Sequence, residues 1–217
     1  HERRLYDAVS NVIDDVVAKG VTREEAQAAG DTKTIEVFEA YDAMVQETLA
    51  QYEAIQEAGY VIEVNNEEPY ANSADMIADL RENKRIKIFS TESGFGDNAI
   101  TPRLRQLNPL LQDTGLADVN GVPLLANDIF RAVHDFFGHA ELGNSFGPKG
   151  EENAWLVHSR MYSPLARRAM TSETRGQNSY VNFSGVNQRI DEMREQAREL
   201  RDNGQIDEAQ ALVNEIY

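Results

Sequence analysis

The sequence predicts a mainly α-helical α+β fold in which helices pack around a small β-sheet. Two observations support this class. Apolar residues recur every three or four positions over most of the 217 residues, as on the buried face of a helix, and two short β-rich runs flank one helical stretch. A chain of this length can bury one substantial core. We therefore predict a single domain over 1–217, with 1–30 and 186–217 as candidate helical appendages.

The N-terminal part of the chain is predicted to form three helices. Residues 2–19 carry an apolar stripe. Thr22 and Glu25 have the spacing of a capping box, which predicts that a second, short helix begins here. The longest stripe covers 33–58, and Gly59 follows it as a natural stop. We expect these apolar faces to pack in the core.

The small sheet is predicted in the middle of the chain. Residues 60–64 and 85–89 are β-rich and partly alternating, and a helical stretch over 73–83 separates them. This order predicts a strand-helix-strand unit. Residues 90–122 are rich in turn-forming residues, and a passage of this length should carry either function or short helices.

The second half of the chain is predicted to be helical apart from one loop. Capping residues, prolines and apolar spacing place helices over five ranges: from 127 to about 138, 151–161, 164–170, 186–203 and 205–216. Residues 172–184 are polar and contain a glycine, and they are predicted to be a loop.

Composition excludes several classes of function. The chain has no cysteine, so disulfides, thiolate metal ligands and cysteine nucleophiles are excluded, and any metal must bind to nitrogen and oxygen ligands. A net charge of −16 repels phosphates and anionic lipid, which disfavours nucleic acid as a partner. No apolar run approaches the roughly 20 residues that span a bilayer, so no membrane partner is expected.

A histidine cluster is the strongest functional signal. Three of the four histidines, His134, His139 and His158, fall within 25 residues together with the only tryptophan. Imidazole is the commonest protein ligand of transition metals. Five residues of a straight α-helix rotate by about 500°, which would leave His134 and His139 about 140° apart. We predict that Gly138 adopts a left-handed conformation that ends the helix and lets the two rings converge.

The remaining members of the predicted site come from nearby positions. Asp135 could orient a ligating histidine or accept a proton, and Glu152 is a second candidate for the catalytic base. His158 is the first choice for a three-histidine site. Glu151 or Glu152 would complete a site of two histidines and one carboxylate, and Glu173 is a further candidate. Glu151 and His158 share a helix face but lie about two turns apart, so one metal ion is not expected to bind both.

Two resemblances bear on this region. The first is carried by the run His134-Asp135-Phe136-Phe137-Gly138-His139. It resembles the His-Glu-x-x-Gly-His motif of the aromatic amino acid hydroxylases, with Asp in place of Glu, and this resemblance implies that His134 and His139 bind non-haem iron.

The second resemblance covers a longer stretch of the chain. It runs from His134 through Gly150-Glu151-Glu152-x-x-Trp155-x-x-His158 to Tyr162-Ser163-Pro164-Leu165-Ala166-Arg167-Arg168 and Thr174-Arg175-Gly176-Gln177-Asn178. This stretch is similar to a group of uncharacterised proteins encoded by bacteriophages. The similarity implies a viral origin and supplies no activity.

A local excess of arginine suggests a substrate. Residues 159–176 contain four arginines against one glutamate in a chain that is strongly acidic overall. Guanidinium groups bind carboxylate and phosphate bidentately, so this segment could hold a small anionic or polar molecule. The alternative is internal salt bridges. The candidate substrate-binding residues are Arg160, Arg168, Arg175, Gln177 and Asn178.

Three functions are compatible with these observations. The first is a metal-dependent enzyme of viral origin whose site binds a divalent metal, with Fe(II) favoured and oxygenase chemistry expected. The second is a zinc-dependent hydrolase with Zn(II) at the same site. The third is a non-catalytic helical virion or host-interaction protein. We expect the protein in the host cytoplasm, with association with the virion as the alternative, and a homo-oligomer could form through helical faces.

Overall fold

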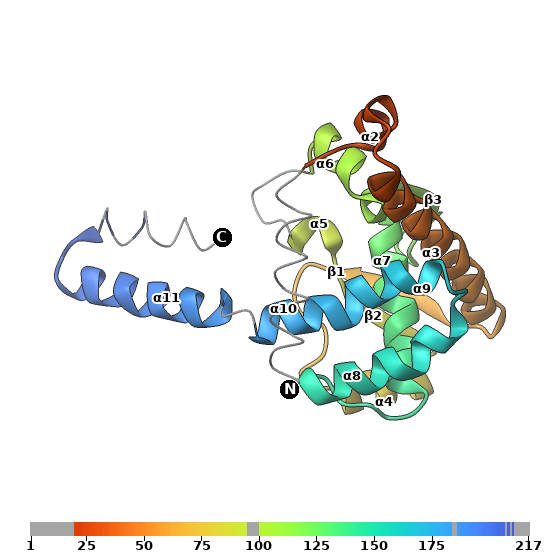
Figure 1. The fold of residues 1–217 in the computed structure, drawn as a ribbon. Coiled ribbons are helices and arrows are strands. Elements are labelled where there is room, and N and C mark those ends of the chain that lie inside the picture. Colours follow the sequence, from red (N-terminus) through yellow and green to blue (C-terminus); the bar gives the residue numbers. More distant parts are fainter. Residues whose placement is uncertain (1–19, 95–99, 184–185, 207, 209, 211–217) are drawn as a thin grey trace. The chain divides into compact units, whose positions relative to one another are not determined.

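The computed structural model describes residues 20–94, 100–183, 186–206, 208 and 210 (Figure 1). The predicted helix over 2–19 and most of that over 205–216 lie outside these residues. The described residues belong to two compact units, one over residues 20–175 and one from Gly176 onward. Their positions relative to each other are not determined, so the predicted single domain with helical appendages stays a prediction.

Two helices open the first unit, α2 (Arg23–Ala29) and α3 (Thr32–Glu57). The predicted capping box is confirmed. The Thr22 hydroxyl accepts the Glu25 amide at 3.2 Å, and the Glu25 carboxylate accepts the Thr22 amide at 2.8 Å. The apolar stripe of α3 buries Met44 and Tyr52, and Gly59 takes the left-handed conformation where the helix has ended.

The predicted strand-helix-strand unit is confirmed as β1 (Val61–Asn65), α4 (Ser73–Asn83) and β2 (Arg85–Phe89). The two strands are parallel, with Val61 opposite Arg85. Neighbouring segments form hydrogen bonds with backbone groups on the outer edge of each strand. The Val119 amide donates to the Ile62 carbonyl at 3.1 Å, and the Tyr70 hydroxyl accepts the Lys87 amide at 2.9 Å.

The turn-rich passage contains short helices, as expected, and also a β-hairpin that was not predicted. Its elements are α5 (Thr91–Gly94), α6 (Pro102–Leu107), the 3₁₀ turn η1 (Pro109–Leu111), β3 (Asp113–Ala117) and β4 (Pro123–Leu125). The two strands pair antiparallel. Buried Asp118 accepts the Val122 amide within the hairpin turn and the Val64 amide of β1, and it thereby joins the hairpin to the sheet.

The site is built from the segment that follows the hairpin. Its elements are α7 (Ala126–His134), the π-helix η2 (Asp135–Ala140), α8 (Pro148–His158), the 3₁₀ turn η3 (Ser159–Met161), α9 (Ala166–Thr171) and the π-helix η4 (Ser172–Gly176). These helices agree with the predicted ones to within a few residues. The predicted loop over 172–184 is wrong for residues 172–183, because η4 and a helix over 177–183 occupy them, while residue 184 lies outside the described residues.

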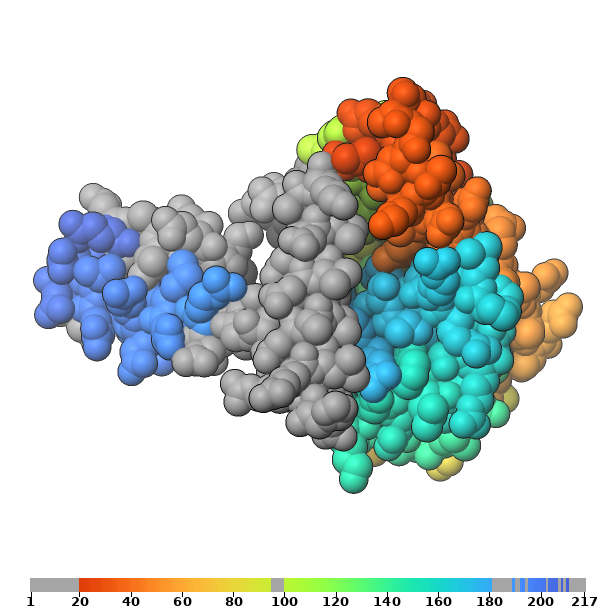
Figure 2. Space-filling model, viewed as in Figure 1, coloured from red at the N-terminus to blue at the C-terminus, as the bar shows by residue number. Residues whose placement is uncertain are grey.

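Helix α7 lies at the centre of the unit and packs on two sides. One buried cluster joins it to α3, α4 and the sheet and includes Met76, Ile86, Ile129 and Val133. The other joins it to α3, α8 and α9 and includes Met44, Phe130, Ala166 and Met170. On the surface, α9 in cyan lies along α3 in orange (Figure 2). The C-terminal end of α7, which carries His134, is therefore held in the interior.

The second unit contains α10 (Gln177–Phe183) and α11 (Val186–Asp202). Helix α11 confirms the helix predicted over 186–203. Among the described residues, no helix combines the length and the apolar character needed to cross a membrane.

Candidate metal centre

A wide helical turn brings the two histidines of the central motif together. His134 is the last residue of α7, and His139 lies in η2. In a π-helix each hydrogen bond spans five residues, and the Glu141 amide accordingly donates to the Phe136 carbonyl at 3.1 Å. Residues five apart therefore lie about one turn above each other, on the same face. The two imidazole centroids are 5.2 Å apart.

The predicted role of Gly138 is wrong in its mechanism. Among the described glycines, those with positive φ do not include Gly138, and the helix does not end there. What this position requires is the absence of a side chain. A Cβ atom at Gly138 would lie 3.1 Å from the His134 ring and 3.1 Å from the Ala154 side chain of α8. The glycine therefore allows α8 to pack closely against the first histidine.

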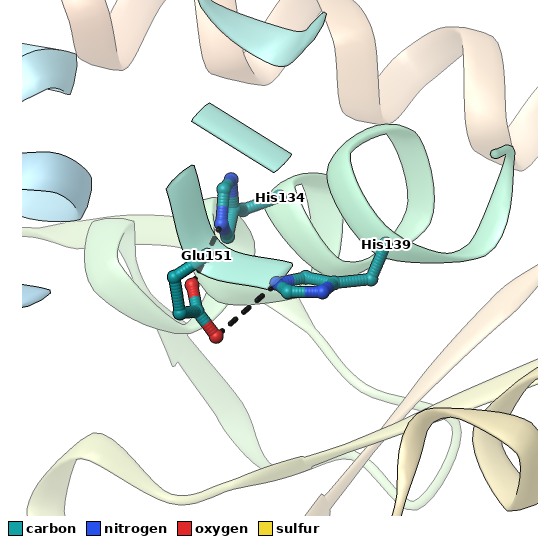
Figure 3. A group of neighbouring side chains, drawn as sticks. All are labelled: His134, His139 and Glu151. Carbon is teal, nitrogen blue, oxygen red and sulfur yellow. Dashed lines mark ion pairs between the residues drawn. The ribbon is translucent and has the colours of Figure 1, made fainter. Parts of the chain in front are cut away.

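Glu151 supplies a third potential ligand from the first turn of α8. Its carboxylate oxygens lie 3.6 Å from His134 Nε2 and 3.4 Å from His139 Nε2. The three side chains point toward one another from three elements, α7, η2 and α8 (Figure 3). Among the described residues, these three form the group whose ligand atoms all lie within 4.8 Å of one another.

The two distances from the Glu151 carboxylate to the histidine nitrogens are close to those expected around one metal ion. With bonds of about 2.1 Å, two ligands at a right angle lie about 3.0 Å apart, and two at the tetrahedral angle lie about 3.4 Å apart. His134 Nε2 is also buried, and none of the described residues is its hydrogen-bond partner. A buried polar atom of this kind is costly unless something binds it, and a metal ion in the group would do so. The His134, His139 and Glu151 cluster could thus hold a metal ion.

The other ring nitrogen of each histidine faces away from the group. His139 Nδ1 lies 3.2 Å from the backbone carbonyl of Asn144, whose side chain donates to the Gly138 carbonyl at 2.8 Å. His134 Nδ1 lies 3.0 Å from Nδ1 of fully buried His158. Ligating histidines typically use their second nitrogen in this way, since such a hydrogen bond fixes the ring.

The electrostatics favour a charged carboxylate between histidines. Burial alone raises the pKa of Glu151, but its contacts with His134 and His139 outweigh burial and hold that pKa at about 2. Burial lowers the pKa of His139, yet the carboxylates of Glu151 and Asp135 more than offset this and raise it. Burial, together with the two neighbouring histidines, brings the pKa of His158 well below its usual value, so this ring is neutral.

Asp135, a candidate catalytic group, is the first residue of η2. Burial raises the pKa of its carboxyl, while the charges of His139 and His134 act in the opposite direction. Its oxygens do not belong to the ligand group of the described residues. A carboxyl with a raised pKa beside such a group can exchange protons in general acid-base catalysis.

The other two glutamates proposed from the sequence make different contacts. Glu152 forms an ion pair with Arg175 at 2.9 Å, and the Arg175 guanidinium stacks over Trp155 with its central carbon 4.5 Å from the ring centroid. Glu173 accepts a hydrogen bond from the Tyr41 hydroxyl of α3. Both carboxylates therefore interact with partners outside the ligand group.

The predicted substrate-binding residues belong to several different elements. Arg168 pairs with Glu36 at 3.8 Å on the surface, and Arg160 is exposed after the end of α8. Gln177 and Asn178 belong to α10 in the second unit. Intramolecular salt bridges, the alternative weighed above, thus occupy Arg168 and Arg175.

Two residues of the site environment were missed in the sequence. Gln51 of α3 approaches His158, with its Oε1 2.9 Å from His158 Nε2, and Asn144 holds the loop around His139. Gln51 lies on a helix far from the motif in sequence, and no local pattern connects the two. Asn144 follows the motif closely, but its role depends on the width of the π-turn.

Comparison of the chain with protein-family models, with curated proteins and with solved structures finds no match.

Replacing Gly138 with alanine is expected to weaken metal binding about tenfold, because the added methyl group would displace the His134 ring. The unfolding free energy should change by less than about 1 kcal/mol, since alanine favours the helical backbone more than glycine does. Competition with a chromophoric chelator measures the affinity. The double variant with Ala154→Gly should recover part of it, and an unchanged affinity in Gly138→Ala would contradict the steric role.

Proposed function

We propose that His134, His139 and Glu151 bind one divalent metal ion and that the protein is a metal-dependent enzyme. The observation that carries this proposal is the convergence of three ligand atoms within 4.8 Å while the outer histidine nitrogens face other partners. Two histidines and one carboxylate leave coordination positions open for small molecules. A purely structural metal site would be closed by a fourth protein ligand.

Fe(II) is the favoured metal, and the favoured activity is of the oxygenase type. Two histidines and a carboxylate are the ligand set of many non-haem iron oxygenases, in which the metal supplies a site for dioxygen and substrate. Within this proposal the chain itself contributes three things. His134 and His139 are oriented through their Nδ1 atoms, Glu151 provides the negative charge, and Asp135 holds or moves a proton beside them.

A zinc-dependent hydrolase is the second candidate, and Asp135 favours it. Two histidines and a glutamate also form catalytic zinc sites, and such sites need a nearby carboxylate as general base. The half-buried carboxyl of Asp135, with its raised pKa, suits that role. The non-catalytic alternative, a helical virion or host-interaction protein, requires the histidines only to pack.

The substrate is proposed to be a small anionic or polar molecule. Exposed Arg160 could still contact an anion. Arg168 and Arg175 would first have to leave Glu36 and Glu152. Viral origin, location in the host cytoplasm or the virion, and self-association through helical faces are further parts of this proposal.

Elemental analysis of protein purified under anaerobic conditions tests the proposal. We expect about one equivalent of a divalent metal per chain. Anomalous scattering at the iron and zinc absorption edges of a crystal would identify the element and the ligands together. Fully folded protein that binds neither metal when supplied would overturn the enzyme proposal and favour the non-catalytic alternative.

A further inference from the structure

A chain of hydrogen-bonding side chains connects the candidate metal centre to a helix that contributes no ligand. His134 Nδ1 lies 3.0 Å from His158 Nδ1, and His158 Nε2 lies 2.9 Å from Gln51 Oε1. The three residues come from α7, α8 and α3. The rings of Phe130 and Phe137 stack on His158, with centroids 6.4 Å and 6.1 Å away. This series of hydrogen bonds therefore runs through the apolar interior.

The direction of these hydrogen bonds follows from the chemistry of each group. A neutral imidazole has one N–H donor and one lone pair, and an amide oxygen only accepts. Because Gln51 Oε1 accepts, His158 must carry its proton on Nε2 and present a lone pair at Nδ1. His134 must then carry its own proton on Nδ1 and donate it to His158.

This direction leaves the lone pair of His134 on Nε2. Nε2 is the atom that lies 3.6 Å from Glu151 and that has no hydrogen-bond partner among the residues that the structure describes. A metal ion binds an imidazole only through a lone pair. The opposite direction would place a proton on Nε2 and close that position. The contacts of Gln51 and His158 therefore select the form of His134 that can bind metal.

His139 reaches the same form by a different route. Its Nδ1 faces the backbone carbonyl of Asn144, which can only accept, so in the neutral ring the lone pair also lies on Nε2. A backbone carbonyl thus sets the tautomer of His139, whereas the side chains of His158 and Gln51 set that of His134. These side chains can be replaced by mutation. This difference makes the role of the side-chain route testable.

Building on the proposed function, we infer that Gln51 and His158 are positioning residues that hold His134 in its metal-binding tautomer. Gln51 acts through His158, and neither residue binds the metal. Hydrogen-bond partners of ligating histidines contribute 10- to 100-fold to metal affinity in general, so roughly that effect is expected here.

Two substitutions at Gln51 distinguish the effect of its hydrogen-bond acceptor from the effect of its side-chain size. Gln51→Met removes the accepting oxygen at similar length and should weaken Zn(II) binding about 10- to 100-fold. Gln51→Glu, in its ionised form, offers oxygens that only accept, and at a pH where this carboxylate is ionised it should bind Zn(II) at least as tightly as the wild type. The affinities are measured by competition with a chromophoric chelator at one pH.

A matched control and a spectroscopic readout distinguish positioning from general stability. Thr48 lies on α3, as Gln51 does, and its hydroxyl shares a buried hydrogen bond with the Tyr162 hydroxyl. Thr48→Val removes this hydrogen bond and should destabilise the fold without changing Zn(II) affinity. Imidazole ¹⁵N spectra of the metal-free protein should show His134 protonated at Nδ1 in the wild type and in Gln51→Glu. In Gln51→Met the other tautomer should gain population.

The outcomes are distinct. If wild-type protein binds Zn(II) and both Gln51 variants bind it equally well with unchanged spectra, the positioning role is overturned while the metal site stands. A wild-type chain that binds neither Zn(II) nor Fe(II) overturns the proposed function itself.

Discussion

Replacing Glu151 with glutamine is expected to reduce metal affinity more than 100-fold. The substitution keeps the size of the side chain but removes the charge that lies between His134 and His139. Loss of a ligand should exceed the 10- to 100-fold effect of losing a partner of a ligand. Elemental analysis and chelator competition on purified protein measure the change, and His134→Ala/His139→Ala should lose the metal to the same extent.

The neighbouring glutamate provides the control. Glu152 lies on the same turn of α8 but pairs with Arg175, so Glu152→Gln should retain the metal. Equal losses in the two glutamine variants would show that general charge, and not ligation by Glu151, governs binding. Retention of metal in Glu151→Gln together with its loss in Glu152→Gln would show that Glu152, and not Glu151, is the ligand.

Replacing Gly150 with alanine is expected to lower the unfolding free energy by about 3 kcal/mol or more. A Cβ atom at this position would lie 1.6 Å from the backbone oxygen of Ser145 and 2.5 Å from its carbonyl carbon. Backbone atoms cannot rotate away as a flexible side chain can, so the loop or the start of α8 must move. Urea denaturation followed by circular dichroism measures the loss.

The same substitution should also weaken metal binding in the fraction that folds. Ser145 follows Asn144, the residue whose carbonyl faces His139, and Gly150 precedes the ligand Glu151. Gly94→Ala is the matched control, because among the described residues its Cβ would meet only the Phe89 ring, at an ordinary 3.6 Å. A Gly150→Ala protein as stable as the Gly94→Ala protein would contradict the steric argument.

Much of the fold could be predicted because its signals are local. The stripe over 33–58 and the capping box at Thr22 are patterns of neighbouring residues, and they correspond to α3 and α2. The β3–β4 hairpin could not be predicted, since β3 is mostly exposed, contains a glycine and shows no alternation of buried residues. Its link to the sheet depends on Asp118, a contact between distant segments.

The residues of the site could be predicted more easily than their arrangement in space. Spacing indicated that Glu151 and His158 share one helix face, and both in fact contact His134, from opposite ring nitrogens. The π-turn was not foreseen, because no periodic pattern distinguishes it from an α-turn in a motif of six residues. The role of Gly138 likewise follows from its contact with Ala154, which only the packed structure provides.

The wide turn of η2 also determines whether the run from His134 to His139 can be transferred to another protein. Grafted into an ordinary helix of another protein, His134 and His139 would emerge on different sides, and a designer would have to delete one residue between them to restore a shared face. Conversely, a motif search that looks only for histidine pairs four positions apart would pass over chains built in this manner. Spacings of five, with a small residue before the second histidine, are worth including in such searches.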